Sequence, residues 1–62
     1  MKIFVCFTSA GKYELTDKEI LNIKPCADKH GNALIQVNYY DFEMCLNQTL
    51  YCVAIDVIDN GE

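Results

Sequence analysis

Residues 28–39 read Asp-Lys-His-Gly-Asn-Ala-Leu-Ile-Gln-Val-Asn-Tyr, and this stretch decides the fold class. Its first part, Asp28–Asn32, is the strongest turn signal of the chain, because residues that favour turns stand between two apolar runs. Apolar and polar residues then alternate, as in a half-exposed antiparallel strand. The apolar face would hold Ala33, Ile35, Val37 and Tyr39, and the polar face Gln36 and Asn38.

The residues before this stretch predict a β-hairpin at the start of the chain. Lys2–Thr8 is expected to form a strand. Both of its faces would be largely apolar, which is typical of a central strand. Ser9–Gly11 would turn the chain, with Gly11 at positive φ, and Lys12–Leu15 would return antiparallel.

Two segments can be interpreted in two ways. Thr16–Glu19 matches a helical capping box that would open a short helix through Ile23, or it is a polar turn that leads into a strand over Ile20–Ala27. We favour the strand, which would place Pro25 at a sheet edge or a bulge because proline donates no ladder hydrogen bond. Asp41–Gln48 fits both period two and one helical face, and its structure stays open.

The last third of the chain predicts one strand that is buried on both faces. Asn47 and Gln48 would turn the chain, Thr49–Ile58 would form the strand, and residues 59–62 would fray. The whole chain, residues 1–62, is thus expected to form a single domain that is mainly β. Five to six short strands would make a small antiparallel barrel or a curled sheet, with at most one short helix.

Residues Glu14–Ile23, with the sequence Glu-Leu-Thr-Asp-Lys-Glu-Ile-Leu-Asn-Ile, look like the diverging turn and following strand of an SH3-like barrel. The resemblance covers about ten residues and implies an SH3-like layout of the strands. The chain has no tryptophan and lacks the tyrosine-rich opening segment that lines the peptide groove of signalling SH3 domains. The resemblance therefore does not imply that this chain binds proline-rich peptides.

Size and charge exclude several classes of protein. A 62-residue chain buries only about 60% of its unfolded surface, too little for an enzyme cleft between two lobes. The net charge is −4, arginine is absent, and residues 31–62 carry five carboxylates and no basic side chain, so nucleic-acid binding is not expected. Thr8 and Ser9 end the apolar opening well below signal-peptide length, and no stretch could span a membrane, so we expect a cytoplasmic protein.

The four cysteines are not spaced as metal ligands, because no CxxC pair occurs. A reducing cytoplasm disfavours disulfides, so we expect Cys6, Cys45 and Cys52 in the core and Cys26 as the most exposed thiol. His30 lies in the turn and is expected to be solvated. We expect no cofactor, no metal and no enzymatic activity.

The segment from Tyr39 to Glu43 is the most suggestive cluster for binding a partner, because tyrosines enrich interface hot spots and carboxylates can rim them. The candidate partner-binding residues are Tyr39, Tyr40, Asp41, Glu43, Asp56 and Asp59. They suggest a non-enzymatic acidic module that docks on a basic partner surface, and small acidic inhibitors or accessory factors of this kind are frequent among phage and mobile-element products.

Two other functions are compatible with the sequence. The chain could form a homo-oligomer in which an uncovered strand pairs with its symmetry mate. It could also be a small barrel that binds nucleic acid through Lys2, Lys12, Lys18 and Lys24, although the charge disfavours this.

Overall fold

The computed structural model describes residues 1–59, which form six strands and contain no helix. The expectation of a mainly β fold is confirmed. The strands are β1 (Lys2–Thr8), β2 (Gly11–Thr16), β3 (Ile20–Ala27), β4 (Ala33–Asp41), β5 (Leu46–Cys52) and β6 (Ala54–Asp59). Asp59 therefore belongs to a strand, whereas the rest of the expected frayed tail lies outside the described residues.

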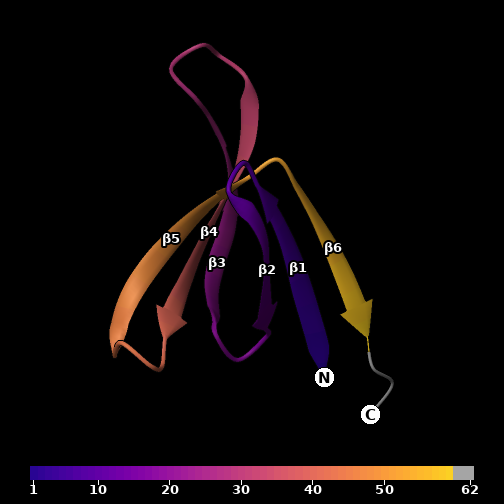
Figure 1. Cartoon of the computed structure of the whole chain (residues 1–62), viewed down its shortest axis with the longest axis vertical. Coiled ribbons are helices and arrows are strands. Elements are labelled where there is room, and N and C mark those ends of the chain that lie inside the picture. Colours follow the sequence, from indigo (N-terminus) through magenta and orange to yellow (C-terminus); the bar gives the residue numbers. More distant parts are fainter. Residues whose placement is uncertain (60–62) are drawn as a thin grey trace.

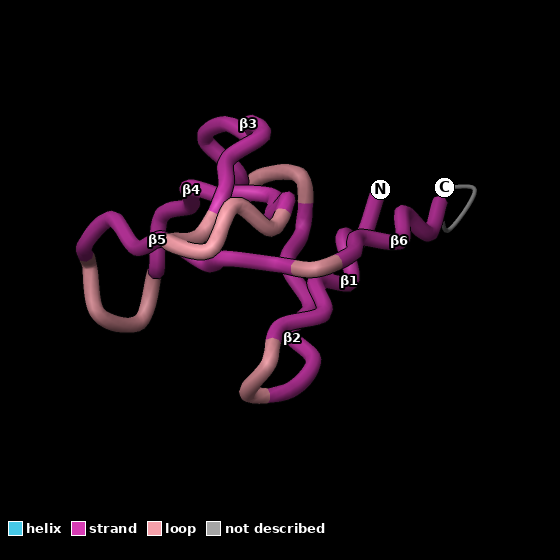
Figure 2. Tube along the Cα trace, turned by 90° about the horizontal axis from the view of Figure 1, so that it is seen from above, coloured by secondary structure: helices cyan, strands magenta, loops and turns pink. Residues whose placement is uncertain are grey.

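The six strands form two three-stranded antiparallel sheets, in the orders β2-β1-β6 and β3-β4-β5. β1 is central, as its two apolar faces predicted, and Pro25 lies on the edge strand β3. The strands splay apart from one place, beyond which the β3–β4 turn projects (Figure 1). The view along the long axis shows the sheets at an angle (Figure 2). The described strands do not close into a barrel, and an SH3-like layout is not confirmed.

The turn between β2 and β3 uses the capping-box residues without forming a helix. The Glu19 carboxylate accepts hydrogen bonds from the Thr16 backbone N–H at 2.8 Å and from the Thr16 hydroxyl at 3.1 Å. The Glu19 N–H in turn donates to the Thr16 carbonyl at 3.0 Å. The Glu19 side chain thus accepts hydrogen bonds within the turn and does not start a helix. β3 follows over Ile20–Ala27, the range favoured from the sequence.

The expected single strand Thr49–Ile58 is wrong, because the chain bends at Val53 and passes from one sheet to the other. The Val53 N–H donates to the Phe7 carbonyl at 2.8 Å at this crossing. The bend shifts the alternation by one residue: Leu50 and Cys52 pack on the core before it, and Ile55 does so after it. Period two alone places Ile55 on the opposite face from Leu50, so the pattern could not reveal the bend.

The core is a small cluster at the place where the two sheets meet. Its buried members are Cys6, Leu15, Val37 and Cys52, and Phe4, Ile20, Ile35, Tyr39, Leu50 and Ile55 pack against them. The opposite face of β4 is polar, as predicted, and Asn38 accepts a hydrogen bond from the Thr49 hydroxyl and donates one to the Asn22 side chain, each at 2.7 Å. One face of each sheet thus supplies the core.

The turn Asp28–Asn32 is confirmed. Asp28 accepts hydrogen bonds from the backbone N–H groups of His30 and Asn32 at 2.8 and 2.9 Å, and Gly31 has a φ of 83°, which favours glycine. Residues 1–59 hold no helix with the length and apolar character needed to cross a membrane.

Replacing Val37 by Ala should lower the free energy of unfolding by about 2 kcal/mol, because two methyl groups leave a fully buried site and a cavity remains. In a domain of this size the Tm should fall by roughly 10 °C. Thermal unfolding followed by circular dichroism measures this shift. The matched control is Val53→Ala, a side chain that is 64% exposed, and its Tm should stay near that of the parent protein. Equal losses in both variants would mean that Val37 is not a core residue.

Candidate functional site

The turn between β4 and β5 is held in one shape by the side chain of Asp41. One carboxylate oxygen accepts the backbone N–H groups of Glu43 and Met44 at 2.9 and 3.1 Å, and the other accepts the Gln48 side-chain N–H at 2.8 Å. The turn ends at Cys45, which adopts the left-handed conformation with a φ of 57°. The hydrogen bond from the Met44 N–H, followed by those from Gln48 and Glu43, lowers the pKa of Asp41.

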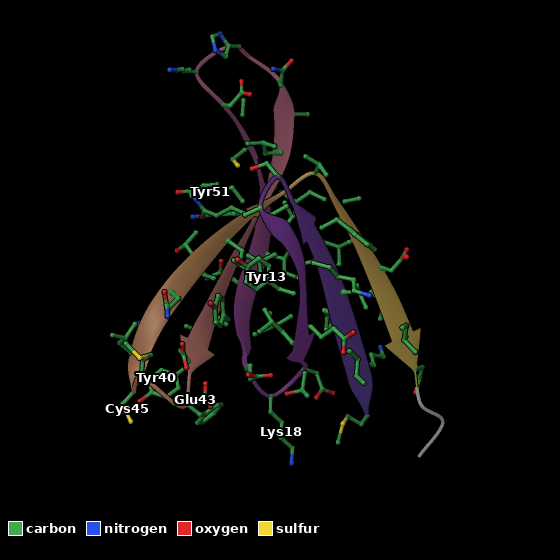
Figure 3. All side chains as sticks on the ribbon, in the orientation of Figure 1. Tyr13, Lys18, Tyr40, Glu43, Cys45 and Tyr51 are labelled. Atoms are coloured by element: carbon green, nitrogen blue, oxygen red, sulfur yellow. The ribbon has the colours of Figure 1, made fainter. Side chains whose placement is uncertain are left out.

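This turn and the first residue of β5 expose three large apolar side chains. Phe42 is 60% exposed, Met44 63% and Leu46 43%. The Tyr40 ring contacts the Phe42 ring edge to face, with centroids 5.0 Å apart. We define the hairpin tip as Tyr40, Phe42, Glu43, Met44 and Leu46; Figure 3 shows Tyr40, Glu43 and Cys45 together at the free end of this hairpin.

Exposed apolar side chains are common on protein surfaces when they occur singly, but a cluster of them marks an interaction surface. Three of the eleven large apolar side chains exposed among the described residues fall within the five residues from Phe42 to Leu46. Asp41 fixes the backbone that carries them. Aromatic and methionine side chains are also the types enriched at protein interfaces.

The structure brings together only part of the predicted partner-binding set. Tyr40, Asp41 and Glu43 lie at or beside the hairpin tip. Tyr39 points the other way and packs against the core, and burial, followed by the nearby Asp41 carboxylate, raises its pKa. This division follows from the alternation of side chains along β4.

Asp56 and Asp59 are on β6 in the other sheet, on the opposite side of the molecule from the hairpin tip (Figure 1, Figure 2). Asp56 pairs across from Val5, whose other neighbour in the ladder is Glu14. Asp59 pairs across from Lys2. These carboxylates therefore cannot rim the same contact as the tyrosine cluster.

Sequence reasoning did not include Phe42, Met44 or Leu46 among the candidate binding residues, although Phe42 lies inside the predicted Tyr39–Glu43 segment. The signal that could have found them is Asp41, because Asp favours a turn in which its side chain accepts N–H groups two and three residues further on. Such a turn stops the period-two alternation of β4. The apolar residues that follow are then carried on a loop instead of a buried face.

Two of the three cysteines expected in the core are there, and one is not. Cys6 and Cys52 have no exposed surface, whereas Cys45 is exposed. The core prediction for Cys45 is wrong because this residue ends the turn at positive φ, and its thiol contacts the Phe42 carbonyl at 3.6 Å. Cys26, expected to be the most exposed thiol, is half-buried and less exposed than Cys45.

The lysines named for nucleic-acid binding do not share one surface. Lys12 faces outward from β2 and Lys24 faces outward from β3, which belong to different sheets. Lys18 lies in the turn between these two strands (Figure 3). The described part of the chain thus presents no continuous basic stripe of the kind that tracks a phosphate backbone.

No protein-family model, curated protein or solved structure matches this chain. Residues 1–59 contain neither a pocket nor a group of side chains arranged to hold a metal ion. The hairpin tip is the strongest candidate for a functional surface in the part of the chain that the structure describes.

The Asp41 carboxyl should titrate below its ordinary pKa of 3.8, because the hydrogen bonds of the turn favour its charged form. Since the pKa is lowered by folding, the carboxylate stabilises the turn at pH values above the ordinary pKa, and this stability is lost as the pH falls through the folded pKa. NMR of the Asp41 carboxyl and of the Glu43 and Met44 amides should follow one shared transition.

The variant Asp41→Asn removes the charge and should abolish this acid transition at the Met44 amide. Glu43→Gln is the matched control, since the Glu43 side chain is exposed, and it should leave the transition in place. A titration midpoint of Asp41 at or above 3.8 would contradict the proposed role of the hydrogen bonds.

Proposed function

We propose that this protein is a non-enzymatic protein-binding module that docks its hairpin tip into an apolar depression with a basic rim on a partner protein. The observation that carries the proposal is the exposure of Phe42, Met44 and Leu46 on a turn whose backbone is fixed by Asp41. A small inhibitor or accessory factor of phage or mobile-element origin is the form of module that we favour for an acidic domain of 62 residues.

Burial of the tip would contribute favourable free energy to binding. A Phe, Leu or Met side chain gains about 1.5–3 kcal/mol when it moves from water into an apolar site, and part of the Phe42, Met44 and Leu46 surface is already covered. The hydrogen bonds of Asp41 order the turn before the partner arrives, which lowers the entropy cost of association. The edge-to-face contact of Tyr40 and Phe42 likewise holds both rings in place.

The charge of the chain supports a basic partner. Glu43 is exposed within the hairpin tip, and residues 31–62 carry no basic side chain. A surface that carries one sign of charge accelerates association with a partner of opposite charge. It also disfavours partners whose surface has the same charge. Asp41 contributes less to this rim, because both its oxygens already accept hydrogen bonds within the turn.

The double variant Phe42→Ser, Met44→Ser should capture the partner from a lysate of the native host at least tenfold less well than the parent protein, since it removes two exposed anchors. Affinity capture followed by quantitative mass spectrometry measures the loss. The variant leaves Asp41 intact, so the turn keeps its hydrogen bonds, which circular dichroism and the Met44 amide shift would verify.

Tyr51→Ser is the matched control, because Tyr51 is 55% exposed but lies at the other end of β5 (Figure 3). Its capture should equal that of the parent protein. The docking role of the hairpin tip is refuted when both variants capture the same proteins to the same extent.

A second candidate function, self-association, is favoured by the edge strand β6. Edge strands are commonly protected by Pro, Lys or a bulge, and β3 has Pro25, Lys24 and a bulge between Ile20 and Asn22. β6 has none of these, and it exposes Val57 by 54% and Ile58 by 49%. An antiparallel β6 pair centred on Val57 would set Asp56 opposite Ile58 of the second copy, which avoids direct contact between like charges.

Light scattering on a size-exclusion column tests self-association. The expected result is a mass that rises from monomer to dimer with concentration, and Val57→Lys should restore the monomer because it places a charge on the pairing edge. Val53→Lys is the control, since Val53 lies at the bend before β6 and is 64% exposed. A monomer at every concentration excludes this function and leaves the hairpin-tip proposal unaffected.

A further inference from the structure

Two cysteines from different sheets lie side by side in the core. Cys6 is on the central strand β1 and Cys52 is the last residue of β5, and neither has exposed surface. The two side chains are close enough for Cys52 to contribute to the raised pKa of Cys6, and both belong to the cluster that joins the sheets. The proposed function uses neither residue.

A backbone hydrogen bond joins β1 to the bend after β5, directly beside the two cysteines. The residues that directly follow the two cysteines, Phe7 and Val53, are joined by the 2.8 Å hydrogen bond from the Val53 N–H to the Phe7 carbonyl. β1 and β5 both run toward the place where the strands converge (Figure 1). A disulfide needs two Cα atoms within about 7 Å whose Cβ atoms point toward each other. Membership of one core cluster and the hydrogen bond between the next residues of the two strands are the observations that favour this geometry.

We propose that Cys6 and Cys52 form a disulfide that links the two sheets when the protein folds in the presence of a low-molecular-weight disulfide. The thiolate of one cysteine attacks the small disulfide, which releases one small thiolate and leaves a mixed disulfide. The thiolate of the second cysteine then attacks the protein sulfur and releases the second small thiolate. Two S–H bonds break and one S–S bond forms in the protein, and the small disulfide is reduced to two thiols.

Burial sets when this bond can form. Loss of solvent at the junction, followed by the nearby Cys52, raises the pKa of the Cys6 thiol to about 11, and burial also raises the pKa of Cys52. The reactive thiolates are therefore scarce in the closed fold, and a small disulfide cannot reach them. The disulfide therefore forms while the junction is still open during folding. Once the fold has closed, a small reductant cannot reach the bond either.

The other two cysteines do not compete for this bond within one chain. Cys26 pairs with Leu34 near the β3–β4 turn, whereas Cys45 lies in the β4–β5 turn at the opposite end of the same sheet (Figure 3). Neither belongs to the core cluster. The Cys6–Cys52 bond is thus the one disulfide that the folded chain favours.

The test uses the variant Cys26→Ser, Cys45→Ser, refolded in buffer with oxidised and reduced glutathione. Trypsin cleaves after Lys2, Lys12 and Lys29, so Cys6 falls in peptide 3–12 and Cys52 in peptide 30–62. Mass spectrometry should show these two peptides linked and the intact protein lighter by two hydrogens. The Tm should exceed that of the reduced protein by about 15 °C, because the bond closes a long loop in the unfolded chain.

A matched sample adds the same glutathione to the protein after it has folded. It should gain the bond at least tenfold more slowly, which separates a buried pair from an exposed one. The parent chain with all four cysteines, digested under the same conditions without reduction, keeps the test valid should the double variant fail to fold. Peptide 30–62 of the parent holds both Cys45 and Cys52, so fragmentation of the linked peptide assigns the bond to one of them. Two free thiols after refolding, a stable glutathione adduct, or linkage of Cys6 to another cysteine in the parent chain would each overturn the proposal.

Discussion

The structure depends on the packing of a few side chains where two small sheets meet. Cys6 and Leu15 come from one sheet, Val37 and Cys52 from the other, and the chain crosses between the sheets at Val53. A 62-residue domain has little apolar surface to bury, and its stability is a small difference between large opposing terms. The residues of this junction therefore have to be small, apolar and closely packed, which two buried thiols satisfy.

The same shortage of core explains why the hairpin tip can expose apolar residues. The β4–β5 hairpin extends away from the junction (Figure 1), so Phe42 and Met44 find no second sheet to cover them. The tip is held instead by polar contacts, from Asp41 to the backbone of the turn and to Gln48. Local hydrogen bonds thus order a surface that the hydrophobic core does not reach.

Much of the fold was predictable because strand alternation and turn chemistry are local properties. β1, β2, β3 and β4 lie where the pattern placed them, and the turns at Gly11 and Asp28–Asn32 have the geometry that their residues favour. The candidate site was predictable only in part. Tyr40, Asp41 and Glu43 were among the candidate binding residues, whereas Met44 and Leu46 were not. The sequence could not identify these two as exposed, because a period-two pattern does not show whether another sheet covers an apolar side chain.

The sequence by itself determined that this chain is a small, acidic, mainly β domain with a central first strand and Pro25 at an edge, since these properties follow from composition, alternation and the missing N–H of proline. Only the tertiary structure decided that the strands split into two sheets, that the chain bends at Val53, and that Cys52 meets Cys6 while Cys45 faces solvent. The physical reason is the range of the interactions. Turns and strands form from contacts between neighbours in sequence, whereas the bend and the paired thiols depend on contacts between residues more than forty positions apart.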